Sequence, residues 1–294
     1  MNLAIRLRLA KQKAEAFLRD EGIAKLAVDP FAIAAGRDIE VLAKPSTADG
    51  VSGMLLRHGD TFGICYATHI PSEGFQRFSI AHELGHYFLE GHIDHILPQN
   101  GVHESHAGFV SSDPYEMEAD QFAAGLLMPS GPFKKELGRR KPGFDTVEHL
   151  AGRCKTSLTA TAIRFAELSD DAVAVIISTG QVIDYCILSE RMKSLRDLSW
   201  LRKGSPVPRN TETARLNANP RRVANAERAE ADIDVMDWLG GRRSAPVIEE
   251  AVGLGRYGKT LTILSSEDLG REDERDEEND DESLIESWAL RFNR

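Results

Sequence analysis

The sequence has few cysteines and no long apolar run at its start. Cys65, Cys154 and Cys186 are odd in number and widely spaced, and none belongs to a CxxC pair. This spacing excludes a CxxC redox or zinc-knuckle motif and indicates reduced thiols rather than a disulfide framework. Residues 1–22 carry a charge on nearly every turn, so they lack the apolar stretch of a signal peptide or a membrane span. We therefore expect a cytoplasmic protein with no membrane partner.

Basic residues are also fewer than acidic ones. The chain has 36 Lys and Arg against 46 Asp and Glu, a formal net charge of -10. A surface of this sign repels phosphate backbones, which disfavours broad nonspecific binding to nucleic acids. Hydrophobic residues at 41% and charged residues at 28% of 294 are typical of a globular protein long enough for two or three domains.

The N-terminal part of the sequence predicts helices followed by a small sheet. Apolar residues at helical intervals predict a helix over Leu3–Asp20, and Pro30 begins a second, short helix. Three short β-rich runs follow, at Ile39–Ala43, Gly53–Arg57 and Phe62–Ala67. His58-Gly59-Asp60, between the last two runs, has the composition of a hairpin turn. We expect these runs to form a small antiparallel sheet.

Two helices separated by a loop come next. An apolar stripe predicts a helix over Gly74–Leu89 that packs on the sheet. The stretch Gly91–Asp113 is rich in glycine, histidine and serine without periodicity, which is typical of a long loop. A second helix is predicted over Pro114–Leu127, and it ends before Pro129 because the residue preceding a proline avoids helical geometry.

The first of these helices carries a His-Glu-x-x-His pattern, His82 to His86. Residues four apart lie on one face one turn apart, so both imidazoles can bind one ion. Catalytic zinc takes three protein ligands and leaves a fourth position for water, so a third ligand must come from elsewhere. Glu83 adjoins a ligand without being one, and a carboxylate beside metal-bound water can take its proton and pass it to a leaving amine. The pattern predicts a Zn²⁺ site with Glu83 as the general base of peptide hydrolysis.

The second helix offers the third ligand. Glu116 and Asp120 lie four residues apart on one face, whereas Glu118 points about 160° away from Asp120. Glu116 is the better ligand, and Glu118 stays an alternative because a helix register inferred from sequence can shift. We expect Asp120 to accept the free ring N–H of a ligand histidine and to fix its orientation.

Four histidines lie between the two motifs: His92, His95, His103 and His106. They lack metal-binding spacing, so we interpret them as solvated loop residues. The alternative is that one of them stabilises a transition state or replaces a ligand.

The motifs together resemble a known family. The segments Arg77–His86, Glu116–Ala124 and Leu126–Pro129 are similar to the ImmA/IrrE metallopeptidases over roughly the first half of the chain. This resemblance implies a zincin-like core in which His82, His86 and Glu116 bind zinc and Glu83 is catalytic. Many members carry asparagine where Asp120 stands. Known members cut or inactivate helix-turn-helix repressors, which implies a repressor encoded nearby as the protein substrate.

The rest of the chain predicts an α+β architecture. Two helices around a tight turn are expected over Asp145–Leu168, strands over Val173–Ser178, Val182–Leu188 and Lys259–Leu264, and a long excursion between strands over Pro206–Arg228. Nine acidic residues in Glu272–Glu282 repel one another, which predicts a solvated linker. The predicted segments are a metallopeptidase core at 1–135, a helix-turn-helix-like segment at 143–170, an α+β domain at 171–266, an acidic disordered linker at 267–283 and a short helix at 284–294.

The helix-turn-helix-like segment departs from the DNA-binding pattern. Lys155 stands where the turn prefers glycine, and Thr156 stands where an apolar residue is common. The helix after the turn offers Arg164 but few other side chains able to read bases. We therefore expect a scaffold or docking role and no specific DNA binding.

Three functions are compatible with these patterns. The leading hypothesis is an intracellular zinc endopeptidase that cuts a specific repressor. The rivals are a DNA-binding regulator and a metal-holding module that sequesters a repressor without cutting it. Salt-sensitive DNA binding would favour the second function, and only an assay of cleavage separates the first from the third.

Overall fold

The structure is a computed structural model that describes residues 2–44, 50–97, 101–106, 112–195, 198–199, 201–242 and 244–269. The chain divides into two compact units. Unit 1 holds Met1–Arg139 and Val147–Arg164, and unit 2 holds Arg140–Thr146 and the chain from Phe165 onward. The mixture of helices and sheets confirms the predicted α+β class. The five-segment division stays a prediction, and the acidic run and the C-terminal helix lie outside the described residues.

Unit 1 begins with two helices whose ends follow local sequence signals. Helix α1 is Leu3–Asp20, and α2 is Pro30–Ala35. The side chain of Asn2 accepts a hydrogen bond from the Ala4 N–H and caps α1, and Asp29 caps α2 in the same way. Both helices lie where the sequence predicted them.

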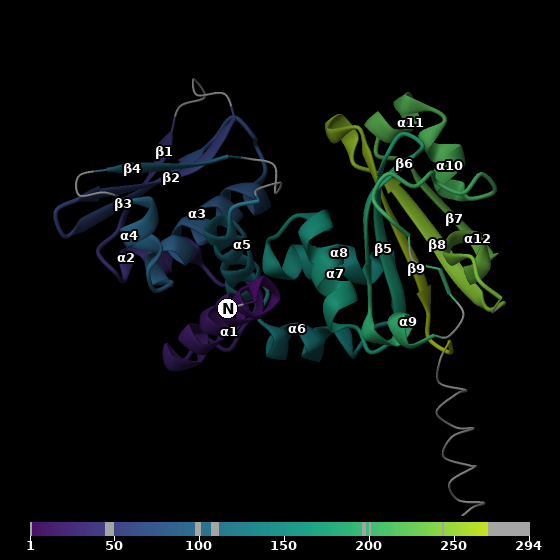
Figure 1. Cartoon of the computed structure of the whole chain (residues 1–294), viewed down its shortest axis with the longest axis horizontal. Helices are drawn as coiled ribbons and strands as arrows, with labels where there is room; N and C mark the ends of the chain where they lie inside the picture. Colours follow the sequence, from purple (N-terminus) through teal and green to yellow (C-terminus); the bar gives the residue numbers. More distant parts are fainter. Residues whose placement is uncertain are drawn as a thin grey trace, which may run out of the picture. The chain divides into compact units, whose positions relative to one another are not determined.

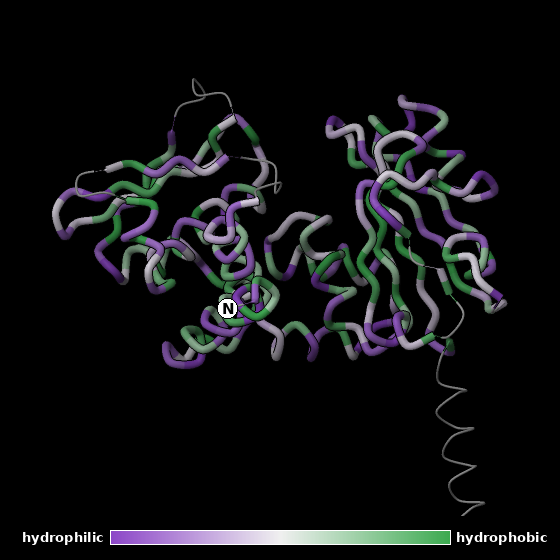
Figure 2. The backbone as a smooth tube through the Cα atoms, viewed as in Figure 1, coloured by the Kyte–Doolittle hydropathy of each residue, from purple (hydrophilic) through white to green (hydrophobic). Residues whose placement is uncertain are grey.

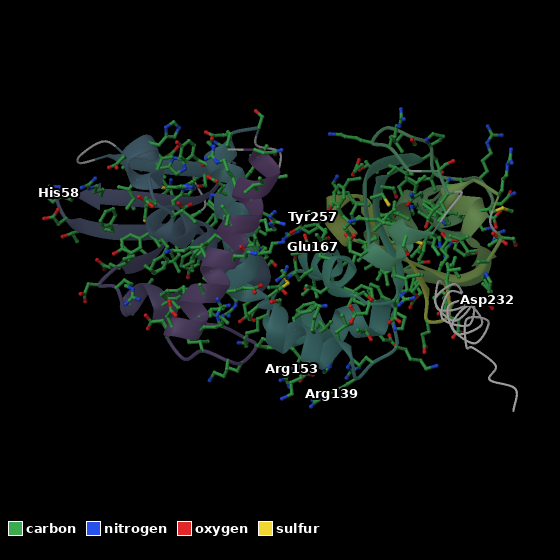
Figure 3. All side chains as sticks on the ribbon, turned by 60° about the horizontal axis from the view of Figure 1, so that its bottom comes forward. His58, Arg139, Arg153, Glu167, Asp232 and Tyr257 are labelled. Carbon is green, nitrogen blue, oxygen red and sulfur yellow. The ribbon has the colours of Figure 1, made fainter. Side chains whose placement is uncertain are left out.

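Unit 1 contains a four-stranded sheet. Its strands are β1 (Glu40–Lys44), β2 (Val51–His58), β3 (Thr61–Ala67) and β4 (Val102–His106), in the order β1-β3-β2-β4. The β2–β3 hairpin is confirmed, and His58 lies at its outer end (Figure 3).

The expectation of an antiparallel sheet is wrong for one pair, because β1 runs parallel to β3. Lys44 at the end of β1 lies opposite Ala67 at the end of β3, and Gly53 near the start of β2 lies opposite Tyr66. The end of β1 therefore lies at the same end of the sheet as the start of β2, so β1 and β2 run in opposite directions. Because β3 also runs opposite to β2 in the hairpin, β1 is parallel to β3.

The predicted loop Gly91–Asp113 is also wrong in part. It contains α4 (His92–Ile96) and strand β4, which pairs antiparallel with β2. Strand β4 reads Val-His-Glu-Ser-His and has no run of β-branched or aromatic residues, so its strand conformation depends on pairing with β2 rather than on its own propensity.

The helices of unit 1 are packed in succession on the sheet (Figure 1). Helix α3 (Glu73–Phe88) packs on β2 and β3, α5 (Pro114–Leu127) packs on α3, and α1 packs on α5. A side chain at Gly85 of α3 would lie 3.1 Å from the Cα of Ala119 in α5. The glycine therefore permits the close crossing of α3 and α5, the two helices that carry the predicted motifs.

Three further helices follow α5 in the chain: α6 (Ser130–Leu137), α7 (Phe144–Cys154) and α8 (Leu158–Leu168). The last two confirm the predicted pair of helices around a tight turn. Lys155 in that turn has a φ of 57°, the left-handed conformation that favours glycine, as the motif pattern predicted.

Unit 2 is built on a five-stranded antiparallel sheet in the order β6-β5-β9-β8-β7. Its strands are β5 (Ala172–Thr179), β6 (Val182–Leu188), β7 (Arg228–Asp234), β8 (Pro246–Gly253) and β9 (Lys259–Ser266). Figure 2 shows the central strands β5 and β9 as largely hydrophobic, in keeping with their buried side chains. The apolar cluster on this sheet includes Ile176, Trp238 and Leu264.

Short helices of unit 2 lie where the sequence lacked periodicity. They are α9 (Glu190–Ser194), α10 (Glu212–Asn217), α11 (Pro220–Ala224), α12 (Val235–Leu239) and the 3₁₀ turn η1 (Gly255–Tyr257). The excursion expected over Pro206–Arg228 therefore contains α10 and α11, which are too short to show an amphipathic period. In the part of the chain that the structure describes, none of the helices is both long and apolar enough to cross a membrane.

Candidate metal centre

Helix α3 presents its histidines from a buried position. Ser72 caps it by accepting a hydrogen bond from the Phe75 N–H, and Glu73 lies in its first turn, where the helix dipole favours an acidic residue. The helix is buried between the sheet and α5, and His82, Glu83 and His86 are among its buried residues. The four-residue spacing aims both imidazoles toward α5.

Helix α5 places Glu116 in its first turn. Asp113 accepts a hydrogen bond from the Tyr115 N–H, and Pro114 occupies the first helical position, where its missing N–H costs nothing. The helix ends at Leu127, before Pro129. These caps fix the register that the sequence left uncertain, and Glu116 faces α3 next to both histidines.

The structure brings His82, His86 and Glu116 together. One ligand atom from each lies within 4.8 Å of the others. The two Nε2 atoms are 3.1 Å apart, and each lies 3.3 Å from an oxygen of Glu116. Two imidazole nitrogens and a carboxylate oxygen are a donor set that zinc takes in catalytic sites, so these residues fit a zinc ion.

The charges of the three groups depend on one another. Burial lowers the pKa of His82, but hydrogen bonds with Asp120 and Glu116 outweigh burial and raise that pKa to about 10. Burial lowers the pKa of His86 to about 3. Burial also opposes ionisation of Glu116, but its contacts with His103, His82 and His86 hold its pKa well below the usual range. The metal-free site thus combines an ionised carboxylate with one neutral and one protonated imidazole at neutral pH.

Each of the three groups is held by one further side chain. The Nδ1 of His82 lies 2.9 Å from Oδ1 of Asp120, the contact that the sequence predicted for Asp120. The Nε2 of His103, on β4, lies 2.9 Å from Oε1 of Glu116. The Nδ1 of His86 lies 3.1 Å from Nδ1 of His92, on α4. Such partners set the orientation and tautomer of metal ligands.

The interpretation of the loop histidines as solvated is therefore wrong for two of them. His92 is 2% exposed, and His103 is half-buried against Glu116. His95 and His106 are exposed, and the ring of His95 stacks on Tyr115. No local pattern marks His92 or His103 as different, because their positions depend on a five-residue helix and on an edge strand that pairs with β2.

Glu83 lies beside the three groups without joining them. Its side chain is fully buried, and neither carboxylate oxygen has a partner in good hydrogen-bond geometry among the described residues, although Ser105 lies near enough to oppose the rise of its pKa. Burial raises the pKa of this carboxyl group. A buried carboxyl group without a partner is costly, so its presence next to the candidate ligands indicates a chemical role rather than a structural one.

The carboxylate of Glu118, the alternative ligand, contacts residues other than the candidate ligands. Its two oxygens accept hydrogen bonds from Nε and Nη2 of Arg6, both at 2.7 Å. The second oxygen also lies 3.1 Å from Nε2 of His92. Burial opposes ionisation of Glu118, but the contacts with Arg6 and His92 hold its pKa below its usual value. Glu118 is thus separated from the cluster of His82, His86 and Glu116 by His92.

Two tyrosines that adjoin the motifs, and Arg164, are held by packing. Tyr87 packs edge-on against Phe62, and Tyr115 contacts His95. Arg164, the residue offered for base reading, is 4% exposed and donates hydrogen bonds to the Met128 carbonyl oxygen and to Glu15.

Comparisons with known proteins bear on this site. Residues 34–166 match the family model described as IrrE N-terminal-like domain, Peptidase_M78. A solved structure described as a Mycobacterium tuberculosis transcriptional regulator is similar to this chain with a TM-score of 0.55 and 17% identity, over 88% of this chain and 76% of that chain. At this identity the likeness concerns the fold alone. The comparison with curated proteins finds no match. Residues 34–166 are thus similar to the IrrE N-terminal-like domain, which confirms over this part of the chain the resemblance to the ImmA/IrrE peptidases that the motifs predicted.

Proposed function

We propose that the chain is a zinc-dependent endopeptidase with a zincin-like core, in which His82, His86 and Glu116 hold Zn²⁺ and Glu83 is the general base. One observation carries this proposal. Three ligand atoms of the types that zinc prefers converge from two helices, next to a fully buried carboxylate whose oxygens have no partner in good hydrogen-bond geometry among the described residues. A surface helix with two chance histidines has no reason to bury such a carboxylate.

The protein side chains divide the chemistry among them. A bound zinc ion would lower the pKa of a water molecule and polarise the scissile carbonyl. Glu83 would take the proton from that water and deliver it to the leaving amine, a task for which a raised pKa suits it. Asp120 and His103 would hold His82 and Glu116 in place during this exchange.

The substrate in this proposal is a folded regulatory protein. The family resemblance implies a helix-turn-helix repressor, and the name of the similar solved structure, a transcriptional regulator, is compatible with a role in gene control. Strand β4 is at the edge of its sheet in the described residues and carries His103, so an extended segment of a substrate can pair with it next to the site. We propose a repressor encoded next to this chain, and a cytoplasmic site of action.

The experiment compares the wild-type chain with Glu83→Gln and with the matched control Glu90→Gln. Glu90 is exposed just beyond the end of α3. Wild type and Glu90→Gln should each cut the repressor encoded nearby into two discrete fragments. A chelator should suppress cleavage by both proteins. Glu83→Gln should keep the metal and bind the repressor while cleavage falls by roughly 10²–10⁴-fold, as for a lost general base.

The same experiment separates the rival functions. If all three proteins bind the repressor and relieve repression while none produces fragments, the chain is a sequestering module and the peptidase proposal is wrong. If repression is relieved only when the chain itself occupies the operator, the DNA-binding regulator is correct.

A further inference from the structure

The N-terminal helix reaches the candidate metal centre although it lies outside the matched residues 34–166. Arg6 of α1 makes two parallel hydrogen bonds of 2.7 Å to the carboxylate of Glu118. The guanidinium group also lies 5.1 Å from the centre of the Tyr115 ring. Paired contacts of this kind fix both groups in the plane they share.

The contacts continue from Glu118 to a candidate ligand. Oε2 of Glu118 lies 3.1 Å from Nε2 of His92, and Nδ1 of His92 lies 3.1 Å from Nδ1 of His86. The Nε2 of His86 faces His82 and Glu116, so the Nδ1 of His86 is the nitrogen that carries the hydrogen. Its N–H donates to Nδ1 of His92, which leaves the hydrogen of His92 on Nε2, where it donates to Glu118. One arrangement of hydrogens therefore satisfies every contact from Arg6 to His86.

We propose that Arg6, Glu118 and His92 form a relay of positioning residues that fixes the tautomer and orientation of His86, so that α1 is part of the metal centre. The inference rests on the proposed function, since it takes His86 as a metal ligand. Arg6 holds Glu118, Glu118 selects the tautomer of His92, and His92 presents a lone pair to His86. Without the relay, the His86 ring is free to turn or to present the wrong nitrogen to the ion.

Arg6 is not needed to hold α1 on the protein. The helix buries Ala10, Ala14 and Leu18, and its Glu15 accepts hydrogen bonds from the Ser130 N–H at 3.1 Å and from the Ser130 hydroxyl at 2.6 Å. Arg6 itself is one-quarter exposed. A substitution at residue 6 should therefore leave the fold in place and act on the relay alone.

The test measures metal affinity by competition with a chelator for Arg6→Gln, Glu118→Gln, His92→Ala and His92→Asn. Losing a partner that orients a metal ligand costs about ten- to a hundredfold in metal affinity. We expect the loss in His92→Ala to fall in this range and the loss in Arg6→Gln to lie near its lower end. Asn at residue 92 offers an oxygen near the position of Nδ1, so His92→Asn should retain more affinity than His92→Ala. Arg8→Gln, an exposed position on the same helix, is the matched control and should bind like wild type.

A second measurement reports on the ring itself. In the Co²⁺-substituted protein, the N–H protons of the two ligand histidines give separate, shifted NMR signals whose exchange with water can be timed. Arg6→Gln and His92→Ala should accelerate exchange of the His86 signal and leave the His82 signal unchanged. Asp120→Ala should do the reverse, because Asp120 contacts His82.

The outcomes separate this inference from the proposed function. If wild type binds no stoichiometric metal, the proposed function fails and the relay fails with it. If wild type binds metal and Arg6→Gln matches it in affinity and in ring exchange, the relay alone is wrong. Equal losses in Arg6→Gln and Arg8→Gln, or a loss that accompanies unfolding, would also overturn the relay in favour of simple helix docking.

Discussion

Gly53 and Glu83 share one small space. A methyl group at residue 53 would lie 2.5 Å from Oε1 of Glu83 and 3.3 Å from its carboxyl carbon. Gly53 lies on β2 opposite Ser105 of β4, so the carboxylate is buried under the sheet where a glycine leaves room for it. The position of the candidate general base thus depends on a residue that has no side chain.

Gly53→Ala should reduce catalysis while keeping the metal. The atom that the new methyl group meets is the free end of a flexible side chain, so the carboxylate moves rather than the strand. A displacement of about 1 Å at a catalytic group costs roughly a hundredfold in rate. Repressor cleavage at equal metal content measures this effect. Gly63→Ala on β3 is the control, since its methyl group would lie 3.7 Å from the nearest atom, a backbone oxygen of Glu40. Full activity of Gly53→Ala would show that the carboxylate can act from another position.

The three candidate ligands should be distinguishable from their neighbours by metal content. His86→Ala and Glu116→Gln each remove a donor that points at the other two, so each should lose most of the bound metal on dialysis. Glu118→Gln should lose less, because Glu118 acts through His92. Metal analysis by atomic emission decides this. If Glu118→Gln strips the metal and Glu116→Gln retains it, the ligand assignment on α5 is wrong.

Asp120 should be replaceable by asparagine but not by alanine. Its contact with His82 is a single hydrogen bond of 2.9 Å, and the oxygen of an asparagine can accept that bond equally well. Asp120→Ala should weaken metal binding or activity by about ten- to a hundredfold, and Asp120→Asn should recover most of the loss. Chelator competition on both variants provides the measurement. An unaffected Asp120→Ala variant would remove Asp120 from the site.

Local signals in the sequence were sufficient to predict the bounds of the capped helices. Helix α1 spans Leu3–Asp20 and helix α5 spans Pro114–Leu127, as the spacing of apolar residues and the prolines predicted. The pair His82 and His86 also follows from helical periodicity alone. Helical periodicity also favoured Glu116 as the third ligand, although an uncertain helix register kept Glu118 as an alternative.

The missed features depend on contacts between distant residues. Arg6 and Glu118 are 112 positions apart, and neither has a neighbour in sequence that marks the pair. Strand β4 gains its hydrogen bonds from β2, and this pairing places His103 next to Glu116. The parallel placement of β1 on β3 likewise follows from how the chain crosses the sheet and not from the composition of β1.

Arg164 should matter for stability and not for DNA. Its guanidinium group is buried and bonded to the Met128 carbonyl oxygen and to Glu15 of α1. Arg164→Ala should lower the free energy of unfolding by about 3 kcal/mol, the lower end for breaking a buried ion pair, as measured by urea denaturation. Arg153→Ala is the control, because Arg153 is half-exposed at the surface (Figure 3) and its ion pair with Glu136 is long, at 3.8 Å. Sequence-selective DNA binding below about 1 µM at physiological salt, lost in a folded Arg164→Ala, would contradict this and favour the regulator function.

Metal binding should release about one proton per ion at pH 7, and His82 is its source. Burial lowers the pKa of His82, but the contacts with Asp120 and Glu116 raise it to about 10 in the metal-free protein. His82 is therefore protonated at pH 7, whereas His86, with a pKa of about 3, is neutral. Because the ion must displace the His82 proton, affinity should rise about tenfold per pH unit and level off as pH passes 10.

Calorimetric titrations with Zn²⁺ in two buffers of different ionisation enthalpy count the released protons. The variant Asp120→Ala provides an internal check, since it removes the strongest contact that raises the pKa of His82. This variant should release less than one proton at pH 7, even though it binds the metal more weakly. Wild type that binds one ion without releasing a proton would show that His82 is neutral before the metal arrives, and the contacts with Asp120 and Glu116 would then orient the ring without charging it.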